Sequence, residues 1–104
     1  MPRRSQLTDT VRETLHYFQQ GKSVAEIAHI RGLKDGTIYT HLEESLLTGE
    51  AIDVSALVSA EAQREIAAAF EKHGFGSLGL VVESFGGKYG YGPCRLVRAA
   101  IQRS

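Results

Sequence analysis

Apolar residues recur every three or four positions through most of the chain, which is the spacing of one face of an α-helix. Three such stripes lie in the first half: Val11, Leu15 and Phe18; Val24, Ile27 and Ala28; and Ile38, Leu42 and Leu46. The pattern predicts three helices, each with one apolar face.

Polar residues at the stripe boundaries predict where the first two helices begin and end. Ser23 and Glu26 have the spacing of a capping box, in which each side chain binds a backbone N–H at a helix start. Thr10 and Glu13 have the same spacing, so the first helix is expected to begin around residues 8–10 and to end at Gly21.

A short turn, Arg31-Gly32-Leu33-Lys34-Asp35, separates the second and third stripes. Gly32 allows a positive φ without steric cost, and Asp35 is expected to cap a third helix that ends near Leu47 or Thr48. So tight a turn requires a steep helix crossing with a small contact residue, which Ala28 supplies. A helix-turn-helix is therefore predicted. An ordinary αα-hairpin has similar spacing, and geometry alone does not establish DNA binding.

The second half is also predicted to be helical. Residues 50–58 form a connector with one turn capped by Asp53, and Ser59 caps a helix at residues 60–73. Residues 78–85 fit a helix or a strand, with helix favoured, and Ser77 as its cap. Pro93 is expected to start the last helix. The residues predicted to face inward are Ala62, Ile66, Ala69, Phe70, Leu96, Val97, Ala100 and Ile101.

Together these elements predict an all-α fold. A trihelical helix-turn-helix core is expected at residues 8–49, with a helical extension at residues 50–104 packed on it as part of one domain. Residues 1–7 are expected to form a flexible basic leader.

Charge is balanced overall but unevenly distributed. Residues 1–42 carry six Lys and Arg against four Asp and Glu, residues 43–71 carry one against seven, and residues 72–104 carry five against one. A polyanion is attracted to the two basic ends and repelled by the acidic middle. Zero net charge favours a weakly binding accessory domain over an autonomous DNA-binding protein.

The outer side of the third helix supplies the candidate DNA-facing residues. Thr37, Tyr39, Thr40 and His41 are predicted to face the groove, and Lys22, Arg31 and Lys34 to meet phosphates. For His41, a polar residue within the helix packing is an equally favoured interpretation. Candidates for secondary nucleic-acid contacts are Arg3, Arg4, Lys88, Arg95 and Arg98. For Arg3 and Arg4, solvated terminal charge is the favoured interpretation. The chain contains no asparagine, and hydroxyl groups suit phosphates, so backbone contact is expected rather than base reading.

A glycine-rich stretch, residues 86–92, carries Lys88, Tyr89 and Tyr91. Aromatic rings beside a lysine suit stacking on unpaired bases. The favoured interpretation is a turn whose tyrosines anchor it to the core.

No catalytic or metal-binding constellation is recognisable. The four histidines are scattered, and Cys94 is the only cysteine, so no internal disulfide is expected. Gly21-Lys22-Ser23 lacks the earlier glycine and strand of a P-loop, and the GxGxxG string at residues 74–79 lacks a βαβ context. No catalysis, metal or cofactor is expected, and a cytoplasmic location without membrane contact is predicted.

With these residues in view, the string SVAEIAHIRGLKDGTIYTHL resembles the helix-turn-helix domain found at the C-terminus of RecQ-type DNA helicases. Similar features are the Gly-Lys-Ser lead-in, the Val58-Ser59-Ala60-Glu61 helix start and the closing Tyr91-Gly92-Pro93-Cys94-Arg95-Leu96-Val97. The likeness covers nearly all of residues 5–103.

The resemblance implies a non-catalytic accessory domain that engages duplex or forked DNA beside helicase motor domains. Two alternatives remain: a LuxR-like transcription regulator, whose central motif has nearly the same spacing, and a protein-interaction module that uses the acidic middle. LuxR-type regulators generally end one helix after the recognition helix, whereas this chain continues for more than fifty residues.

Overall fold

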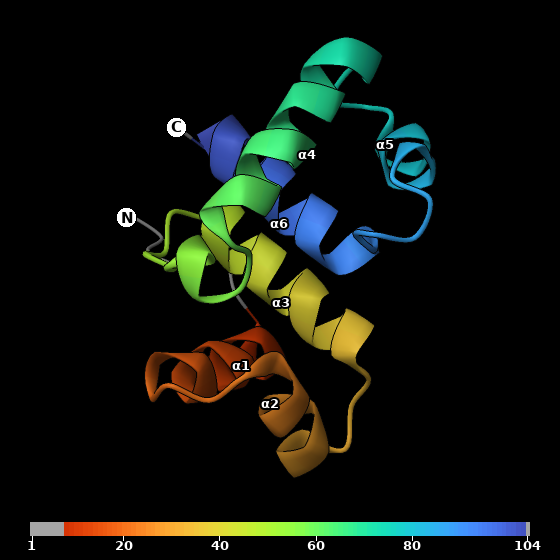
Figure 1. Ribbon diagram of the computed structural model, residues 1–104. Helices are drawn as coiled ribbons and strands as arrows, with labels where there is room; N and C mark the ends of the chain where they lie inside the picture. The colour runs from red at the N-terminus through yellow and green to blue at the C-terminus, as the bar shows by residue number, and fades with distance from the viewer. Residues whose placement is uncertain (1–7, 104) are drawn as a thin grey trace. The chain divides into compact units, whose positions relative to one another are not determined.

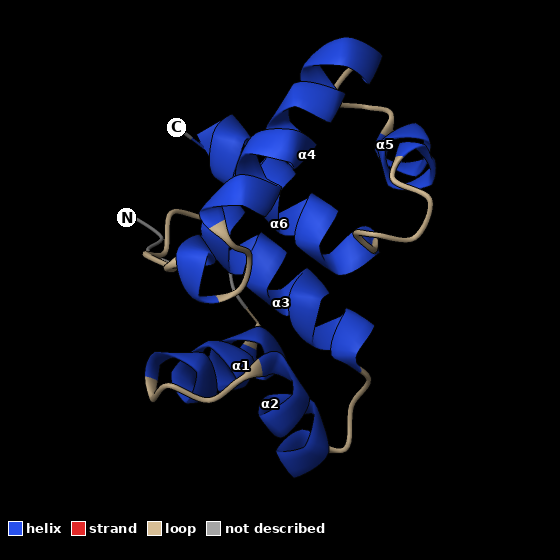
Figure 2. Ribbon diagram, in the orientation of Figure 1, coloured by secondary structure: helices blue, strands red, loops and turns tan. Residues whose placement is uncertain are grey.

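The computed structural model describes residues 8–103, and all regular structure in that range is helical (Figures 1 and 2). The predicted all-α fold is confirmed. The helices are α1 (Asp9–Gln19), α2 (Val24–Arg31), α3 (Asp35–Leu47), the short 3₁₀ helix η1 (Val54–Ala56), α4 (Ala60–His73), α5 (Leu78–Ser84) and α6 (Tyr91–Arg103). The expected leader at residues 1–7 lies outside the described residues.

The chain divides into two compact units, the first ending at Ile52 and the second beginning at Asp53. The first unit holds α1, α2 and α3, and the second holds η1, α4, α5 and α6. No helix among the described residues is long and apolar enough to cross a membrane.

In the first unit, α3 packs against both α1 and α2. Ile27, Ile38 and Leu42 have no exposed surface, and Val11 and Leu15 are also buried, with Ile52 packed against that pair. The apolar stripes therefore face one another as predicted. Phe18 is the exception, since it stays partly exposed near the end of α1.

Helix starts in the first unit follow the capping prediction only at α2. There Glu26 N–H donates to Ser23 Oγ at 3.1 Å, and Ser23 N–H donates to Glu26 Oε1 at 2.8 Å. For α1 the prediction was wrong, because the capping residue is Thr8, whose hydroxyl accepts from Val11 N–H. Thr10 and Glu13 are instead engaged by Arg31.

The turn between α2 and α3 has the predicted glycine geometry. Gly32 ends α2 with φ of 67° and ψ of 33°, the left-handed conformation that glycine adopts most easily. Asp35 is the first residue of α3 rather than its cap. The capping position belongs to Lys34, whose side chain makes no capping hydrogen bond.

In the second unit the predicted caps at Asp53 and Ser59 are confirmed by hydrogen bonds to Ser55 N–H and Ala62 N–H. Residues 78–84 are helical, although Ser77 makes no side-chain capping bond. Helix α6 begins at Tyr91, two residues before the predicted start. Pro93 still lies in the first turn, where its missing N–H costs no helical hydrogen bond.

The core of the second unit contains Ile66, Phe70, Val81 and Leu96, none of which has exposed surface. Phe70 stacks on Phe75 with ring centres 5.5 Å apart. On α6 the most buried residues are Cys94, Leu96, Val97 and Ala99. Ala100 and Ile101, which were predicted to be buried, are partly exposed, as is Ala69 on α4.

Candidate nucleic-acid interface

Helix α3 has one buried side and one open side. Thr37 and Lys34 are exposed at its beginning, and Tyr39 and Thr40 are partly exposed. His41 is only 8% exposed. The structure therefore leaves the first turn of α3 accessible, as predicted, but corrects the position of His41.

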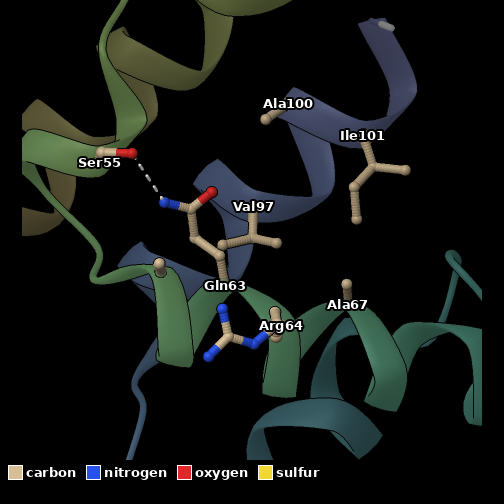
Figure 3. Close-up of a pocket in the computed structure, with 8 residues that line it drawn as sticks. Ser55, Gln63, Arg64, Ala67, Val97, Ala100 and Ile101 are labelled. Carbon is tan, nitrogen blue, oxygen red and sulfur yellow. Dashed lines mark hydrogen bonds between the residues drawn. The ribbon is translucent and has the colours of Figure 1, made fainter.

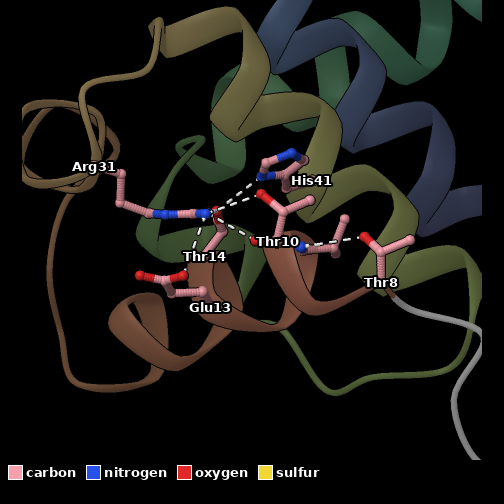
Figure 4. Close-up of polar contacts among 7 residues, drawn as sticks. Thr8, Thr10, Glu13, Thr14, Arg31 and His41 are labelled. Carbon is pink, nitrogen blue, oxygen red and sulfur yellow. Dashed lines mark hydrogen bonds and ion pairs between the residues drawn. The ribbon is translucent and has the colours of Figure 1, made fainter.

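Arg31 is an internal tie rather than an exposed phosphate ligand. Its guanidinium reaches from α2 to α1, where it donates to the Thr10 carbonyl at 2.7 Å, the Thr10 hydroxyl at 2.9 Å and the Thr14 hydroxyl (Figure 4). It also pairs with Glu13 at 3.4 Å, and its side chain is only 10% exposed. These bonds engage both terminal nitrogens of the guanidinium within the fold, so the structure corrects the expected exposed position of Arg31.

His41 joins the same polar cluster from α3. Its Nδ1 lies 2.8 Å from Thr14 Oγ1, which is itself held by Arg31 (Figure 4). His41 lies three residues after Ile38 and four before Ser45, and both of those residues are fully buried. Helical spacing therefore places its side chain on the inner face. That signal was present in the sequence.

Burial lowers the pKa of His41, and the positive charge of Arg31 lowers it further, against a smaller opposite effect of Glu44. The ring is therefore neutral at pH 7. The Thr14 hydroxyl accepts from Arg31, so its own hydrogen is available for His41 Nδ1. The cluster therefore joins α3 to α1 and α2 through directional polar contacts.

Two hydroxyl groups on the open side of α3 differ in what they already bind. Thr40 Oγ1 donates its hydrogen to the Gly36 carbonyl at 3.0 Å, so that hydrogen is not offered outward. Burial raises the pKa of Tyr39, as does the Asp35 carboxylate, so the phenol keeps its proton. Thr37 and Tyr39 are thus the better-placed hydroxyl donors.

Carboxylates limit the part of α3 that a polyanion approaches. Asp35 is exposed in the first turn, and Glu44 is exposed at the start of the second half. Lys34 is exposed beside Asp35, and Lys22 is partly exposed before α2. The accessible positive and hydrogen-bonding groups therefore lie at the beginning of α3 and before α2.

The predicted secondary contacts lie in the second unit, apart from Arg3 and Arg4, which fall outside the described residues. Lys88 Nζ is 3.1 Å from Glu65 Oε1 and lies over the Tyr89 ring. Arg98 donates to the Phe75 carbonyl at 3.1 Å, and Arg95 is partly exposed on the same helix.

A groove of about 410 Å³, which sequence reasoning missed, lies between α4 and α6 (Figure 3). Its apolar walls come from Ala67, Val97 and Ile101, and Arg64 lies at its edge. Gln63 is tied down by hydrogen bonds from its Nε2 to the Val58 carbonyl and to Ser55 Oγ. No sequence signal pointed to this groove, because the helical stripe predicts the burial of Ile101, which the structure leaves partly exposed.

No group of three or more His, Cys, Asp or Glu side chains suited to a metal ion occurs within residues 8–103. Cys94 is buried, and that burial raises the pKa of its thiol. A thiol in these surroundings is a poor nucleophile, because the thiolate is the reactive form.

Comparison with known proteins places these features in a family. Protein YpbB of Bacillus subtilis (strain 168) is 41% identical over 61 residues, which make up 59% of this chain and 17% of YpbB. The chain thus corresponds to a small part of that relative. No solved structure matches. A family model described as a helix-turn-helix domain matches residues 10–98, which include α2, the turn, α3 and most of the second unit. By that match, the chain belongs to a family of helix-turn-helix domains.

Proposed function

We propose that this chain is a non-catalytic DNA-binding accessory domain of a RecQ-like DNA helicase. It contacts the backbone of duplex DNA through the first two turns of α3. The observation that carries this proposal is the orientation of α3, whose Lys34 and Thr37 are exposed while Ile38, His41 and Leu42 are buried. A helix held in this way by two others is the arrangement that helix-turn-helix proteins use to enter the major groove.

The chemistry of this surface suits phosphate groups. The Lys34 ammonium supplies charge, and the hydroxyls of Thr37 and Tyr39 supply hydrogen-bond donors. Lys22 adds a second cation before α2. None of these groups has the forked geometry that reads guanine or adenine in the major groove. Binding with little sequence preference and a strong dependence on salt follows.

An accessory role agrees with the charge and the size of the chain. A net charge of zero leaves little long-range attraction for DNA, so binding is weak unless neighbouring domains hold the DNA nearby. The family match continues to residue 98, far beyond α3, which favours this role over a LuxR-like regulator. The much greater length of YpbB is consistent with a domain that acts within a larger protein.

Two threonines on α3 provide a matched test. Thr37→Val removes an exposed hydroxyl, whereas Thr40→Val removes one that is bound to Gly36. Fluorescence anisotropy with a labelled 20-base-pair duplex at low salt should show about tenfold weaker binding for Thr37→Val, since a hydrogen bond to a charged group contributes about 1.5 kcal/mol or more. Thr40→Val should bind within about twofold of the unchanged protein, because its hydroxyl is not offered to DNA.

Lys34→Ala should reduce the slope of log affinity against log salt by about one, as expected for one lost phosphate contact. Thr37→Val should leave that slope unchanged, because it removes no charge. If the wild-type domain shows no duplex binding at low salt, or if Lys34→Ala keeps the full slope, the α3 surface is not the DNA site.

The groove between α4 and α6 favours a second candidate, a protein-interaction module (Figure 3). Its apolar walls with a guanidinium at the edge suit an amphipathic segment carrying a carboxylate. NMR titration of the labelled chain with duplex DNA separates the two functions. Shifts clustered at residues 34–40 support DNA binding, and their absence at low salt leaves the interaction module as the better candidate.

A further inference from the structure

One side of α6 carries an aromatic residue followed by two arginines. Tyr91, Arg95, Arg98 and Gln102 are spaced by four, three and four residues, so they share one face of the helix. Tyr91 is 52% exposed, Gln102 is exposed, and both arginines are partly exposed, whereas Cys94, Leu96 and Val97 between them are buried. We call these four residues the Tyr91 face.

Tyr89, which precedes α6, and Tyr91, its first residue, have different surroundings. Tyr89 donates its hydroxyl to Glu65 at 2.7 Å and packs edge-on against Phe85, with ring centres 4.8 Å apart. Tyr91 instead has its hydroxyl beside Gly79 of α5, where an added Cβ would lie 3.9 Å from it. Tyr89 therefore anchors the glycine-rich turn, while Tyr91 offers its ring to solvent.

The charge on the Tyr91 face is positioned by the fold. Arg98 donates to the Phe75 carbonyl at 3.1 Å, and this bond orients its guanidinium. Residues 72–104 carry five Lys and Arg against one Asp or Glu. A surface with a cation near an exposed aromatic ring attracts anions that also present a flat apolar group.

We propose that the Tyr91 face binds an unpaired DNA strand. One base stacks on Tyr91, and Arg95 and Arg98 contact phosphates of the same strand. Arg98 lies about 10 Å along the helix axis from Tyr91, which is roughly the rise of three stacked nucleotides. Stacking requires a base released from the duplex, so this surface selects single-stranded nucleic acid over a closed helix.

This inference rests on the proposed function, which it extends from duplex backbone contact to a second, single-stranded ligand. The two surfaces lie in different units of the chain. Each is therefore tested with its own variant and its own DNA probe.

The test uses the full chain with fluorescein-labelled oligothymidine of 15 nucleotides and, separately, a duplex of 20 base pairs. Tyr91→Ala should weaken oligothymidine binding about tenfold, because base stacking on an aromatic ring typically contributes this much. Tyr91→Phe keeps the ring and should bind within about twofold of the unchanged protein. Arg95→Gln should lower the single-strand salt slope by about 0.7, the value for one phosphate contact.

A stacking readout guards against mere loss of folding. Wild-type protein and Tyr91→Phe should quench the fluorescence of 2-aminopurine in the oligonucleotide, whereas Tyr91→Leu, which keeps an apolar side chain without a π face, should not. Circular dichroism confirms that each variant is folded. If Tyr91→Leu quenches like the unchanged protein, or if Tyr91→Ala weakens both DNAs equally, the inference is overturned.

The two proposals fail separately. Loss of the Thr37→Val effect on the duplex, with the Tyr91→Ala effect on oligothymidine intact, overturns only the α3 surface. Loss of the Tyr91→Ala effect on oligothymidine, with the Thr37→Val effect on the duplex intact, overturns only the Tyr91 face.

Discussion

His41 of α3 and Thr14 of α1 are joined by a hydrogen bond of 2.8 Å between Nδ1 and Oγ1, and the Arg31 guanidinium of α2 binds the same hydroxyl. One residue from each helix of the first unit therefore meets at a single oxygen atom. Apolar packing tolerates small rotations of a helix, whereas a buried polar cluster requires defined geometry. The cluster thus sets which side of α3 remains open, and so which residues are presented outward.

Acidification should weaken the first unit through His41. Its pKa is lowered in the fold by burial and by Arg31, with Thr14 beside it on α1 and Glu44 opposing on α3. The unfolded chain therefore takes up a proton first as the pH falls below about 6.5. The contribution to stability is complete above that pH and is lost as the pH falls through the lower folded value. Urea denaturation at pH 8, 6.5 and 5 should show the decline.

His29 supplies the control for this experiment, because it is exposed on α2. His29→Ala should retain the pH dependence, and His41→Gln should remove most of it while lowering stability at pH 8. An unchanged pH profile in His41→Gln would show that another group is responsible.

Replacing Arg31 should lower the free energy of unfolding more than it lowers the positive charge available to DNA. Arg31→Ala removes hydrogen bonds to Thr10, Thr14 and Glu13 and leaves the buried Thr14 hydroxyl with a missing donor. We expect a loss of about 1–3 kcal/mol in the free energy of unfolding, measured by urea denaturation. Arg31→Lys should recover little of it, because an ammonium lacks the planar fork that reaches several acceptors at once.

Arg12, which is exposed on α1, is the matched control, and Arg12→Ala should change stability by less than about 0.5 kcal/mol. Full stability in Arg31→Ala together with a reduced salt slope for DNA would restore Arg31 to the role of a phosphate ligand.

Two glycines near the turn should respond to alanine in opposite directions. Gly32 has a φ of 67°, where a Cβ is strained, so Gly32→Ala should cost about 1 kcal/mol or more. Gly36 lies within α3 without positive φ, and an added Cβ there meets no atom within 4 Å. Gly36→Ala should therefore stabilise by up to about 1 kcal/mol. Thermal unfolding of both variants checks the signs, and a stabilising Gly32→Ala would contradict the turn geometry.

The sequence alone predicts the features of the fold that depend on local chemistry. The capping box at Ser23, the glycine turn at Gly32 and the Ser59 cap depend on residues within a few positions of one another. It was insufficient where distant residues compete for one side chain. Arg31 carries the guanidinium that is typical of phosphate ligands. Its hydrogen bonds are accepted instead by residues on α1 that lie 17 to 21 positions away in the sequence, a pairing that no local pattern reveals.

His41 and the start of α6 show two other causes of error. Helical spacing placed His41 on the inner face, but its polarity suggested an exposed role, and the polar partners that make burial favourable come from other helices. Proline is tolerated throughout the first turn of a helix, so Pro93 indicates a helix start without fixing its first residue, and α6 begins at Tyr91. The pattern of glycines around Tyr91 indicates a loop and so hides its place on the same helix as Arg95 and Arg98.

The glycine-rich turn should depend more on Tyr89 than on Lys88. Both bind Glu65 Oε1, Tyr89 at 2.7 Å and Lys88 at 3.1 Å, and both bonds lower the pKa of that carboxyl, with the larger effect from Tyr89. The Lys88 side chain is 58% exposed, so its ion pair contributes little in water.

Tyr89→Phe should therefore speed amide hydrogen exchange at residues 86–90 severalfold, and Lys88→Ala should leave it nearly unchanged. Glu65→Ala, which removes the shared acceptor, should resemble Tyr89→Phe. Because the Glu65 pKa is lowered, these contacts persist above about pH 4.5 and weaken as the pH falls further. Equal effects of Lys88→Ala and Tyr89→Phe would show that charge, rather than the phenol hydrogen bond, holds the turn.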